Sequence, residues 1–409
     1  MLSKDFDFSI YERLLRLGED WAVSEVMLDE SNDTLNITIF YKHDYWVDKE
    51  TGEMIPIHDF RKSRSWRHLD CMEFKTVIHC RLPRIKTAEG KVRTIAYDWA
   101  ESDFSHTKKF ENKCIEVLQA THNRKSTSEL MRVSDDKICG IMHSAVERGL
   151  KRRDLSNVRK ISLDEKSYKK GHQYLTVLTN SITGAVLDVE QDRTEASAER
   201  LLTRTFTEEQ LSNITTTCCD MWDAFTNALK KKCPNARLVF DKFHVVKHLT
   251  QAIDKTRREE VKSEEILKKT RYMFLKRLDT MTDKQRKRFE TENIKNTQTA
   301  GAWRMRENFL ALYDCENQEE ASTYFECWYK SVIHSSNEYM KKAAKTIKEH
   351  IGNIITQIGV EISNARAEQT NSKIAKIQRA AQGFRSYSNL RTAILFFNGS
   401  LRLFHTINE

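Results

Sequence analysis

The sequence predicts an α+β protein in which a mixed sheet flanked by helices is interrupted by an all-α segment. Residues 160–241 alternate short apolar, β-branched runs with helix-like segments, whereas residues 250–350 consist almost entirely of charge-rich, helix-forming sequence. Only 3 prolines and 12 glycines in 409 residues also favour long helices over a disordered or repetitive chain. A small β-rich module and a helix-turn-helix are predicted before the sheet.

The first hundred residues are predicted to form the β-rich module, after a short helix near residues 11–17. Segments 21–30 and 33–42 alternate around a Ser-Asn-Asp turn and predict a hairpin, and segments 74–82 and 91–99 alternate likewise around a loop. Five basic residues cluster between the strands: Arg61, Lys62, Arg64, Arg67 and His68. The histidines and cysteines lack the paired spacing of a zinc ribbon and are interpreted as structural: His58, His68, Cys71, His79 and Cys80.

Three helices are predicted next, at residues 110–118, 126–131 and 134–149. Ser134 is expected to cap the third helix, and a tight turn at Arg132 precedes it. This pattern is typical of a helix-turn-helix whose last helix lies in the major groove, and equally of an ordinary small helical domain. A basic linker at 151–154 follows.

The central domain is predicted from five apolar runs and the helices between them. Strands are expected at 161–164, 174–179, 185–190, 213–219 and 237–240, helices at 196–206 and 221–230, and a loop at 166–172. The helical block at 250–350, with a loop only at 291–301, is interpreted as an inserted domain. A helix over 363–379, stopped by Gly383, and a final helix over 384–398 complete the chain.

Acidic residues recur where the predicted strands end. Asp164, Asp220 and Asp241 each follow an apolar run, and Glu368 lies in the helix before Gly383. One such aspartate is usually a turn or cap residue, but four carboxylates together fit a magnesium site, because hard divalent ions take oxygen ligands. Basic residues that follow Glu368 suit a neighbouring polyanion, although a solvated helix face looks the same: Lys373, Lys376 and Arg379.

Composition agrees with a polyanionic partner such as DNA. The net charge is +9 with 31% charged residues, and this surplus favours binding to phosphate backbone. Nine cysteines without a Cys-x-x-Cys pair fit a reduced compartment. No stretch has the apolar length of a signal peptide or a membrane span, so a soluble, intracellular protein without a membrane partner is expected.

Four blocks carry a family resemblance: DEKSYKKGHQYLTV (164–177), CDMWDAF (219–225), VFDKFHVVKHL (239–249) and NARAEQTNSKIAKIQRAAQGFR (364–385). In this order they resemble the landmark blocks of bacterial DDE transposases of the ISL-three insertion-sequence family. The similarity extends over about residues 161–384 and, more loosely, through the amino-terminal module. Family members carry cysteine pairs of a zinc ribbon there, but residues 41–46 and 85–90 lack cysteine, so zinc is not expected.

The resemblance implies an RNase H-like catalytic domain with a helical insertion. It implies catalytic and metal-binding roles for Asp164, Asp220 and Glu368, and a supporting role for the D-x-x-H pair Asp241 and His244. Asp241 remains a rival for the second carboxylate, and Glu165 is a weaker rival to Asp164 because neighbours on a strand point to opposite faces. Lys169 and His172 are expected to approach the scissile strand.

The implied function is that of a transposase. It would use two Mg²⁺ ions, with Mn²⁺ as a possible substitute, to cleave DNA at terminal inverted repeats and to transfer the strand into target DNA. Because two ends must be processed together, a homodimer or higher oligomer is expected, in the bacterial cytoplasm at the nucleoid. A catalytically inactive, transposase-derived DNA-binding protein and an RNase H-like structure-specific nuclease remain alternatives.

Five domains follow from these patterns. The β-rich module comprises 1–102 and the helix-turn-helix domain 103–155. The catalytic domain is expected in two parts, 156–250 and 356–409, separated by the helical insertion at 251–355.

Overall fold

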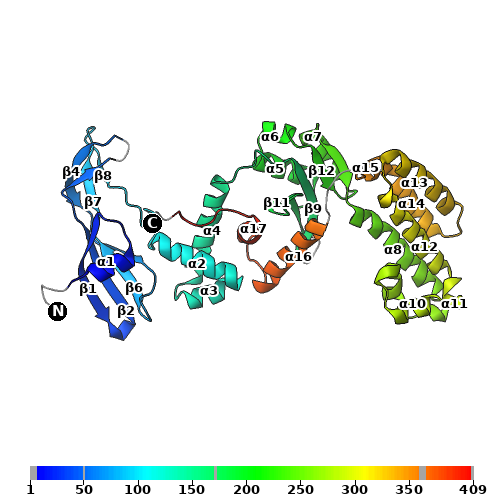
Figure 1. Ribbon diagram of the computed structural model, residues 1–409, viewed down its shortest axis with the longest axis horizontal. Helices are drawn as coiled ribbons and strands as arrows, with labels where there is room; N and C mark the ends of the chain where they lie inside the picture. The colour runs from blue at the N-terminus through cyan, green and yellow to red at the C-terminus, as the bar shows by residue number, and fades with distance from the viewer. Residues whose placement is uncertain (1–6, 49–50, 170–172, 359–364, 407–409) are drawn as a thin grey trace. The chain divides into compact units, whose positions relative to one another are not determined.

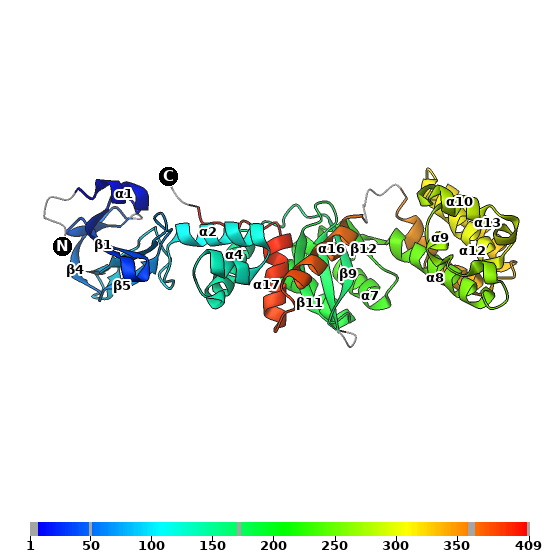
Figure 2. The ribbon, with the colours of Figure 1, turned by 90° about the horizontal axis from the view of Figure 1, so that it is seen from below.

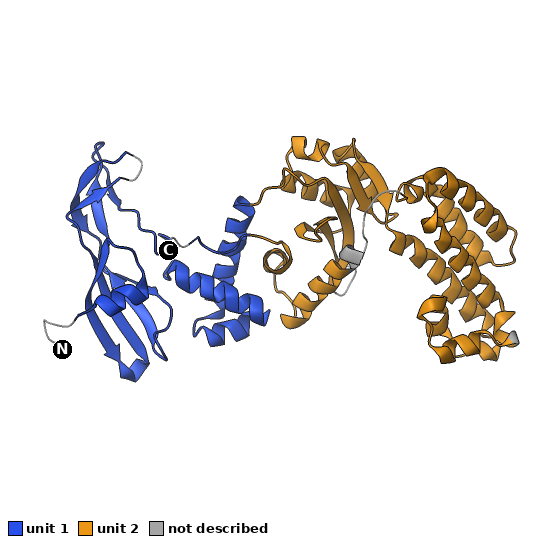
Figure 3. Ribbon diagram, in the orientation of Figure 1, with its two compact units in different colours: residues 1–152, 402–409 blue, residues 153–401 orange. Residues whose placement is uncertain are grey.

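The computed structural model describes residues 7–48, 51–169, 173–358 and 365–406, without the side chains of residues 169, 292 and 365–368. The chain forms two compact units, residues 1–152 with 402–409 and residues 153–401 (Figure 3). Three sheets and many helices confirm the predicted α+β class. Among the described helices, none combines the length and apolar character needed to cross a bilayer.

The first unit begins with helix α1 (Ser9–Leu15) and two four-stranded sheets (Figure 1). The predicted hairpin is confirmed as the antiparallel pair β1 (Trp21–Asp29) and β2 (Thr34–Tyr41). Strands β6 (Lys75–Cys80) and β5 (Arg64–Arg67) complete the sheet in the order β1-β2-β6-β5. The second sheet has the order β3-β4-β7-β8, from β3 (Tyr45–Val47), β4 (Met54–Phe60), β7 (Pro83–Lys86) and β8 (Val92–Thr94).

In this unit one strand was predicted too long, and strands β3, β4, β5 and β7 were not predicted. The segment predicted as a strand over 91–99 is a strand only at Val92–Thr94, and beyond it Trp99 packs edge-on against Trp66, with ring centroids 4.9 Å apart. The basic cluster near residue 64 contains strand β5, because the Arg64 guanidinium stacks on buried Trp66, 5.0 Å from the ring centroid. A long arginine side chain can therefore pack on an apolar residue of a strand, and its charge conceals the strand from a reading of hydrophobic alternation.

Three helices follow where they were predicted: α2 (Lys108–Thr121), α3 (Arg124–Leu130) and α4 (Asp135–Lys151). Ser134 caps α4, because its Oγ accepts a hydrogen bond from the Lys137 N–H at 3.2 Å. The segment 402–406 packs on these helices rather than with 356–401, since the Arg148 side chain donates to the Leu403 carbonyl at 2.7 Å.

The second unit is built on a five-stranded mixed sheet in the order β11-β10-β9-β12-β13, which confirms the predicted mixed sheet. Strands β9 (Lys160–Lys169), β10 (Gln173–Asn180) and β11 (Val186–Gln191) are antiparallel neighbours. Strands β12 (Thr216–Cys219) and β13 (Arg237–Phe240) run parallel to β9. The flanking helices are α5 (Glu195–Thr205), α6 (Glu208–Ser212), α7 (Asp223–Lys232), α16 (Ala365–Ala380) and α17 (Tyr387–Asn398).

Strand β9 is longer than predicted, and residues 166–169 belong to it rather than to a loop. Lys166 pairs with Leu175 and Ser167 with Tyr174, so the hairpin ladder continues through polar residues beyond the buried part of the sheet. Asp164 therefore lies within a strand, opposite Val177, and not at a strand end. Strand β12 is shorter than predicted and begins at Thr216 instead of residue 213.

The predicted helical block is confirmed between β13 and α16. Its helices are α8 (Lys242–Glu260), α9 (Arg271–Leu275), α10 (Asp283–Phe289), α11 (Glu292–Lys295), α12 (Gln298–Leu310), α13 (Gln318–Ile333), α14 (Glu338–Glu349) and α15 (Ile351–Ile355). The predicted loop over 291–301 was wrong, because it contains α11 and the start of α12. Its polar Thr297 is a helix cap whose Oγ1 accepts from the Ala300 N–H at 3.1 Å.

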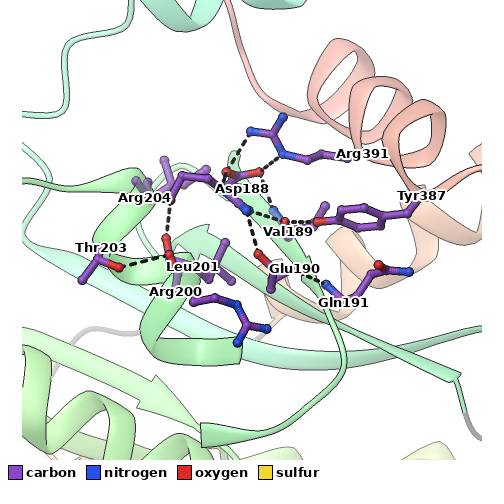
Figure 4. A network of polar contacts seen from close by, with 12 residues as sticks. Asp188, Val189, Glu190, Gln191, Arg200, Leu201, Thr203, Arg204, Tyr387 and Arg391 are labelled. Carbon is purple, nitrogen blue, oxygen red and sulfur yellow. Dashed lines mark hydrogen bonds and ion pairs between the residues drawn. The ribbon is translucent and has the colours of Figure 1, made fainter. Parts of the chain in front are cut away.

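A buried carboxylate joins two helices to the edge strand β11 (Figure 4). Asp188 accepts hydrogen bonds from Arg204 Nε of α5 at 2.9 Å and from Arg391 Nε of α17 at 2.7 Å. The Tyr387 hydroxyl donates to the Val189 carbonyl at 2.6 Å beside this network. The Asp188 side chain is only 4% exposed, so both arginines stabilise a charge that water does not reach.

Asp188→Ala is expected to lower the free energy of unfolding by about 2–4 kcal/mol, because two charged hydrogen-bond partners lose their acceptor. Lys231→Ala removes an exposed ion pair to Glu199 in the same unit and is expected to cost less than about 1 kcal/mol. Urea unfolding of both variants measures this difference. Equal decreases in the free energy of unfolding for the two variants would show that the Asp188 network does not stabilise the fold more than an exposed ion pair does.

Candidate active site

Strand pleating brings the three predicted aspartates to one face of the five-stranded sheet. The residues directly before them, Leu163, Cys219 and Phe240, all belong to the core that includes α5 and α7 residues. Because successive side chains on a strand point to opposite faces, Asp164, Asp220 and Asp241 point away from that core. The repeated order, an apolar residue and then an aspartate, therefore has a structural cause.

Strand register then aligns the aspartates in one row. Ser162 of β9 lies opposite Cys218 of β12, so the same parallel register, extended by two residues, sets Asp164 opposite Asp220. Cys219 lies opposite Phe240 of β13, which sets Asp241 beside Asp220 in the same way. Three carboxylates far apart in the sequence thus converge at one edge of the parallel strands.

His244 lies at the centre of this row. Its Nε2 is 3.8 Å from Asp164 Oδ1 and 3.9 Å from Asp241 Oδ2, and its Nδ1 is 3.8 Å from Asp220 Oδ2. The histidine is held there by the first turn of α8, which Asp241 caps by accepting a hydrogen bond from the Phe243 N–H at 2.7 Å. One carboxylate oxygen of Asp241 is thus occupied by the helix cap, whereas Asp220 caps no helix among the described elements.

Helix α16 supplies the fourth side of the site. Figure 2 shows α16 lying across the sheet, where it contacts β9. The Asn371 Nδ2 donates to Asp164 Oδ2 at 2.5 Å, and Thr370 Oγ1 donates to the Gly184 carbonyl at 3.2 Å. Glu368 lies in the first turn of α16, but its side chain is outside the described residues.

Burial controls the electrostatics of the site. It raises the pKa of Asp220 to about 6, against the opposing attraction of His244, and it raises the pKa of Asp164 as well. Asp220 Oδ1 and Asn371 Oδ1 are buried without a hydrogen-bond partner. These two oxygens are free to act as metal ligands, and they lie beside the closely spaced carboxylates of Asp164 and Asp220. A hard divalent cation prefers oxygen ligands and would neutralise the negative charge of the two aspartates. Among the described residues, no group of three His, Cys, Asp or Glu side chains is already spaced to hold a metal ion.

The comparison with known proteins decides the family. A family model described as transposase, that of the ISL3 (ISL-three) DDE transposases, matches residues 161–394, which is more than half of the chain. The chain belongs to this family. The matched range contains the whole row of aspartates together with α16.

Two curated relatives of this transposase support the same assignment. The transposase for insertion sequence element IS1557 of Mycobacterium tuberculosis is 24% identical over 352 residues, which cover 79% of each chain. The transposase for insertion sequence element IS1001 of Bordetella parapertussis is 22% identical over 336 residues, covering 79% of this chain and 81% of the relative. DDE transposases act on DNA and generally use divalent metals, so the family implies DNA as the partner.

The rival carboxylate Glu165 lines the same cavity as Asp164, Asp241 and His244 in this transposase, and it is paired with an arginine there. Its Oε2 accepts from the Arg193 guanidinium at 2.8 Å. That guanidinium stacks on Tyr174, 4.1 Å from the ring centroid, and on Trp222 at 5.1 Å. Burial is the main cause of the raised pKa of Asp220, and the charge of Glu165 adds to it, so Glu165 lies near Asp220. To hold a metal there Glu165 would have to leave its ion pair with Arg193, whereas Asp164 makes no ion pair with an arginine or lysine among the described residues.

Three of the remaining predicted residues of the transposase lie on α16. Lys373, Lys376 and Arg379 are exposed on α16, opposite its buried residues Ile374 and Ile377. None of the three contacts the row of aspartates among the described interactions. The Lys169 side chain and all of His172 lie outside the described residues.

Two residues near the aspartates were not predicted as site residues. Asn371 contacts Asp164, and Lys247 lines the same cavity of about 240 Å³ as Asp164 and His244. Asn371 follows Glu368 by three residues on one helical stripe, and Lys247 follows His244 by three in α8. Helical spacing of three from a predicted site residue is the signal that could have found both.

Proposed function

We propose that the protein is an active DDE transposase that cleaves DNA at the terminal inverted repeats of an insertion sequence and transfers the freed strand into target DNA. The observation that carries this proposal is the row of Asp164 and Asp220, in register on adjacent parallel strands and each 3.8 Å from His244. The strand order β11-β10-β9-β12-β13, with three antiparallel strands followed by two parallel ones, supports an RNase H-like assignment.

Glu368 is the third proposed carboxylate. It precedes Asn371 by three residues in α16, and residues three apart share a helix face. Because Asn371 contacts Asp164, this spacing supports a position for Glu368 near the same edge of the sheet. We therefore assign catalysis and the holding of two Mg²⁺ ions, or Mn²⁺ as a substitute, to Asp164, Asp220 and Glu368.

The bound ions would supply Lewis-acid activation of the attacking water or hydroxyl and offset charge on the reacting phosphate. The chain's own residues prepare that site. The Asn371 amide orients the Asp164 carboxylate, and Asp241 caps α8 so that His244 stays between the aspartates. In this arrangement Asp241 and His244 are supporting residues, and Asp220 is the second carboxylate.

DNA contacts are proposed on both sides of the site. The phosphate backbone would be bound, and the scissile strand positioned, by Lys373, Lys376 and Arg379 along α16, by Lys169 at the end of β9 and by His172. The three helices α2, α3 and α4 would read the inverted repeats as a helix-turn-helix within 103–155, with the β-rich module 1–102 beside them. Two ends processed together require a homodimer or a larger assembly.

Further domain limits are part of the proposal. The catalytic domain would comprise 156–250 and 356–401, short of the expected limit at 409 because 402–406 packs on the helices of the first unit, and the helical insertion 251–355. Helix α8 is continuous across residue 250, so the insertion grows directly out of the helix that carries His244.

A cleavage and joining assay tests the proposed function. DNA that contains an element end, incubated with the full chain and Mg²⁺, should be nicked at the end and then joined to a target plasmid. Binding without nicking would identify the inactive DNA-binding protein instead. Nicking of branched or hybrid substrates without joining would identify a structure-specific nuclease.

A further inference from the structure

A groove of about 840 Å³ adjoins the candidate active site along α8. It is lined by residues of α8, α9 and α12, by Arg277 after α9 and by Gln357 after α15. Phe243 and Lys247 line both this groove and the smaller cavity that contains Asp164, Asp241 and His244. The groove therefore borders the cavity that contains Asp164 and Asp241.

The lining of the groove is strongly basic. Seven of its fifteen lining residues are lysine or arginine, and Asp254 is the one acidic residue among them. The Asp254 carboxylate is already bound by Arg257 and Arg258, each at 2.9 Å. Lys247 and Lys255 lie within ion-pair distance of no carboxylate that the structure describes, although the charge of Lys247 acts on Asp220 at longer range, so both can bind a polyanion.

An exposed aromatic ring stands where the groove meets the active site. Phe243 is 49% exposed, and its ring packs edge-on against the His244 ring with centroids 5.6 Å apart. Val246 and Leu310 extend the apolar surface beside it. A cationic groove with an exposed aromatic ring combines the two features that bind single-stranded nucleic acid, backbone neutralisation and base stacking.

We propose that this groove binds, as a single strand, the few nucleotides next to the phosphodiester that is cleaved, with Phe243 stacking on one of their bases. A groove of this volume is in the range of pockets for drug-sized molecules, which matches a few unstacked nucleotides and not a duplex. Lys247 and Lys255 contact the phosphates. The inference rests on the proposed function, because it says where the DNA strand next to the cleaved phosphodiester is bound.

Binding of labelled oligonucleotides to the full chain tests this inference. Fluorescence anisotropy in EDTA compares a short single strand with its duplex, so no cleavage interferes. Phe243→Ala should weaken single-strand binding by about 5- to 150-fold, the range for losing one base–aromatic stack, and Phe243→Tyr should restore it. Lys247→Ala with Lys255→Ala should lower the slope of log affinity against log salt by about 1.4, the value for two single-strand phosphate contacts.

Lys284→Ala with Lys287→Ala is the matched control, since both lysines are exposed on α10 and lie outside the groove lining. An unchanged affinity for the control and a selective loss of single-strand binding for Phe243→Ala support the inference. Equal losses for single strand and duplex, wild-type binding by Phe243→Ala, or an equal loss in the control pair overturn it. The proposed function fails separately, because a chain that never nicks DNA can still bind the single strand in EDTA.

Discussion

Glu368→Gln is expected to abolish nicking of element-end DNA, with a loss on the order of 10³-fold or more, while binding of the same DNA is retained. The substitution keeps the size of the side chain and removes its charge, so a divalent ion loses one anionic oxygen ligand. Stabilisation of transition-state charge by such an ion contributes several kcal/mol, and each 1.4 kcal/mol corresponds to about tenfold in rate. Nicking rates and gel-shift affinities on one DNA substrate measure both properties.

Glu349→Gln is the matched control for this experiment, because Glu349 is an exposed glutamate at the end of α14. It should nick at the wild-type rate. If Glu368→Gln also nicks at that rate, Glu368 does not belong to the active site. If it no longer binds DNA, its effect cannot be assigned to the metal site.

Asp220→Asn is expected to stabilise the metal-free protein at pH 7 while it removes both catalysis and stabilisation by Mg²⁺. Burial raises the pKa of Asp220 to about 6 from an ordinary value of 3.8, so the folded state holds this proton more tightly than the unfolded state. The protonated Asp220 carboxyl therefore contributes its full stabilisation of the folded state below pH 3.8, and this contribution is lost as the pH rises through about 6. The free energy of unfolding of the metal-free variant should therefore exceed that of the wild type by on the order of 2–3 kcal/mol at pH 7 and should equal it near pH 4.

Calorimetry in EDTA and in Mg²⁺, at several pH values, measures this effect. Asp241→Asn is the contrast, because asparagine caps a helix as well as aspartate does and the Phe243 N–H keeps its acceptor. We expect Asp241→Asn to retain stabilisation by Mg²⁺. The reverse result, with Asp241 and not Asp220 required for the metal effect, would make Asp241 the second carboxylate.

The sequence was sufficient to predict the elements that have a clear hydrophobic periodicity or a clear helix-capping residue. Strands β10, β11 and β13, helix α5 and the Ser134 cap of α4 were predicted close to their observed bounds. The convergence of Asp164, Asp220 and Asp241 was also predicted, although for Asp164 the stated reason was wrong. It lies within β9, and strand register, rather than a strand end, brings it to the row.

The elements that could not be predicted depend on contacts between distant residues. Strand β5 is hidden by Arg64, whose charge masks its packing on Trp66, and the tail 402–406 is placed by Arg148, far away in the sequence. Asn371 is polar and looks like any residue of a solvated helix face. Only the hydrogen bond to Asp164, across more than two hundred residues, gives it a role.

Iron-mediated cleavage of the polypeptide tests the central claim most directly. Fe²⁺ replaces Mg²⁺ at oxygen-ligand sites, and with ascorbate and peroxide it cuts the backbone next to the bound ion. We predict cuts at three separate places, near residues 164, 220 and 368, which excess Mg²⁺ suppresses together. Cuts near 164 and 220 that leave the segment around 368 intact would contradict a metal site shared by all three carboxylates.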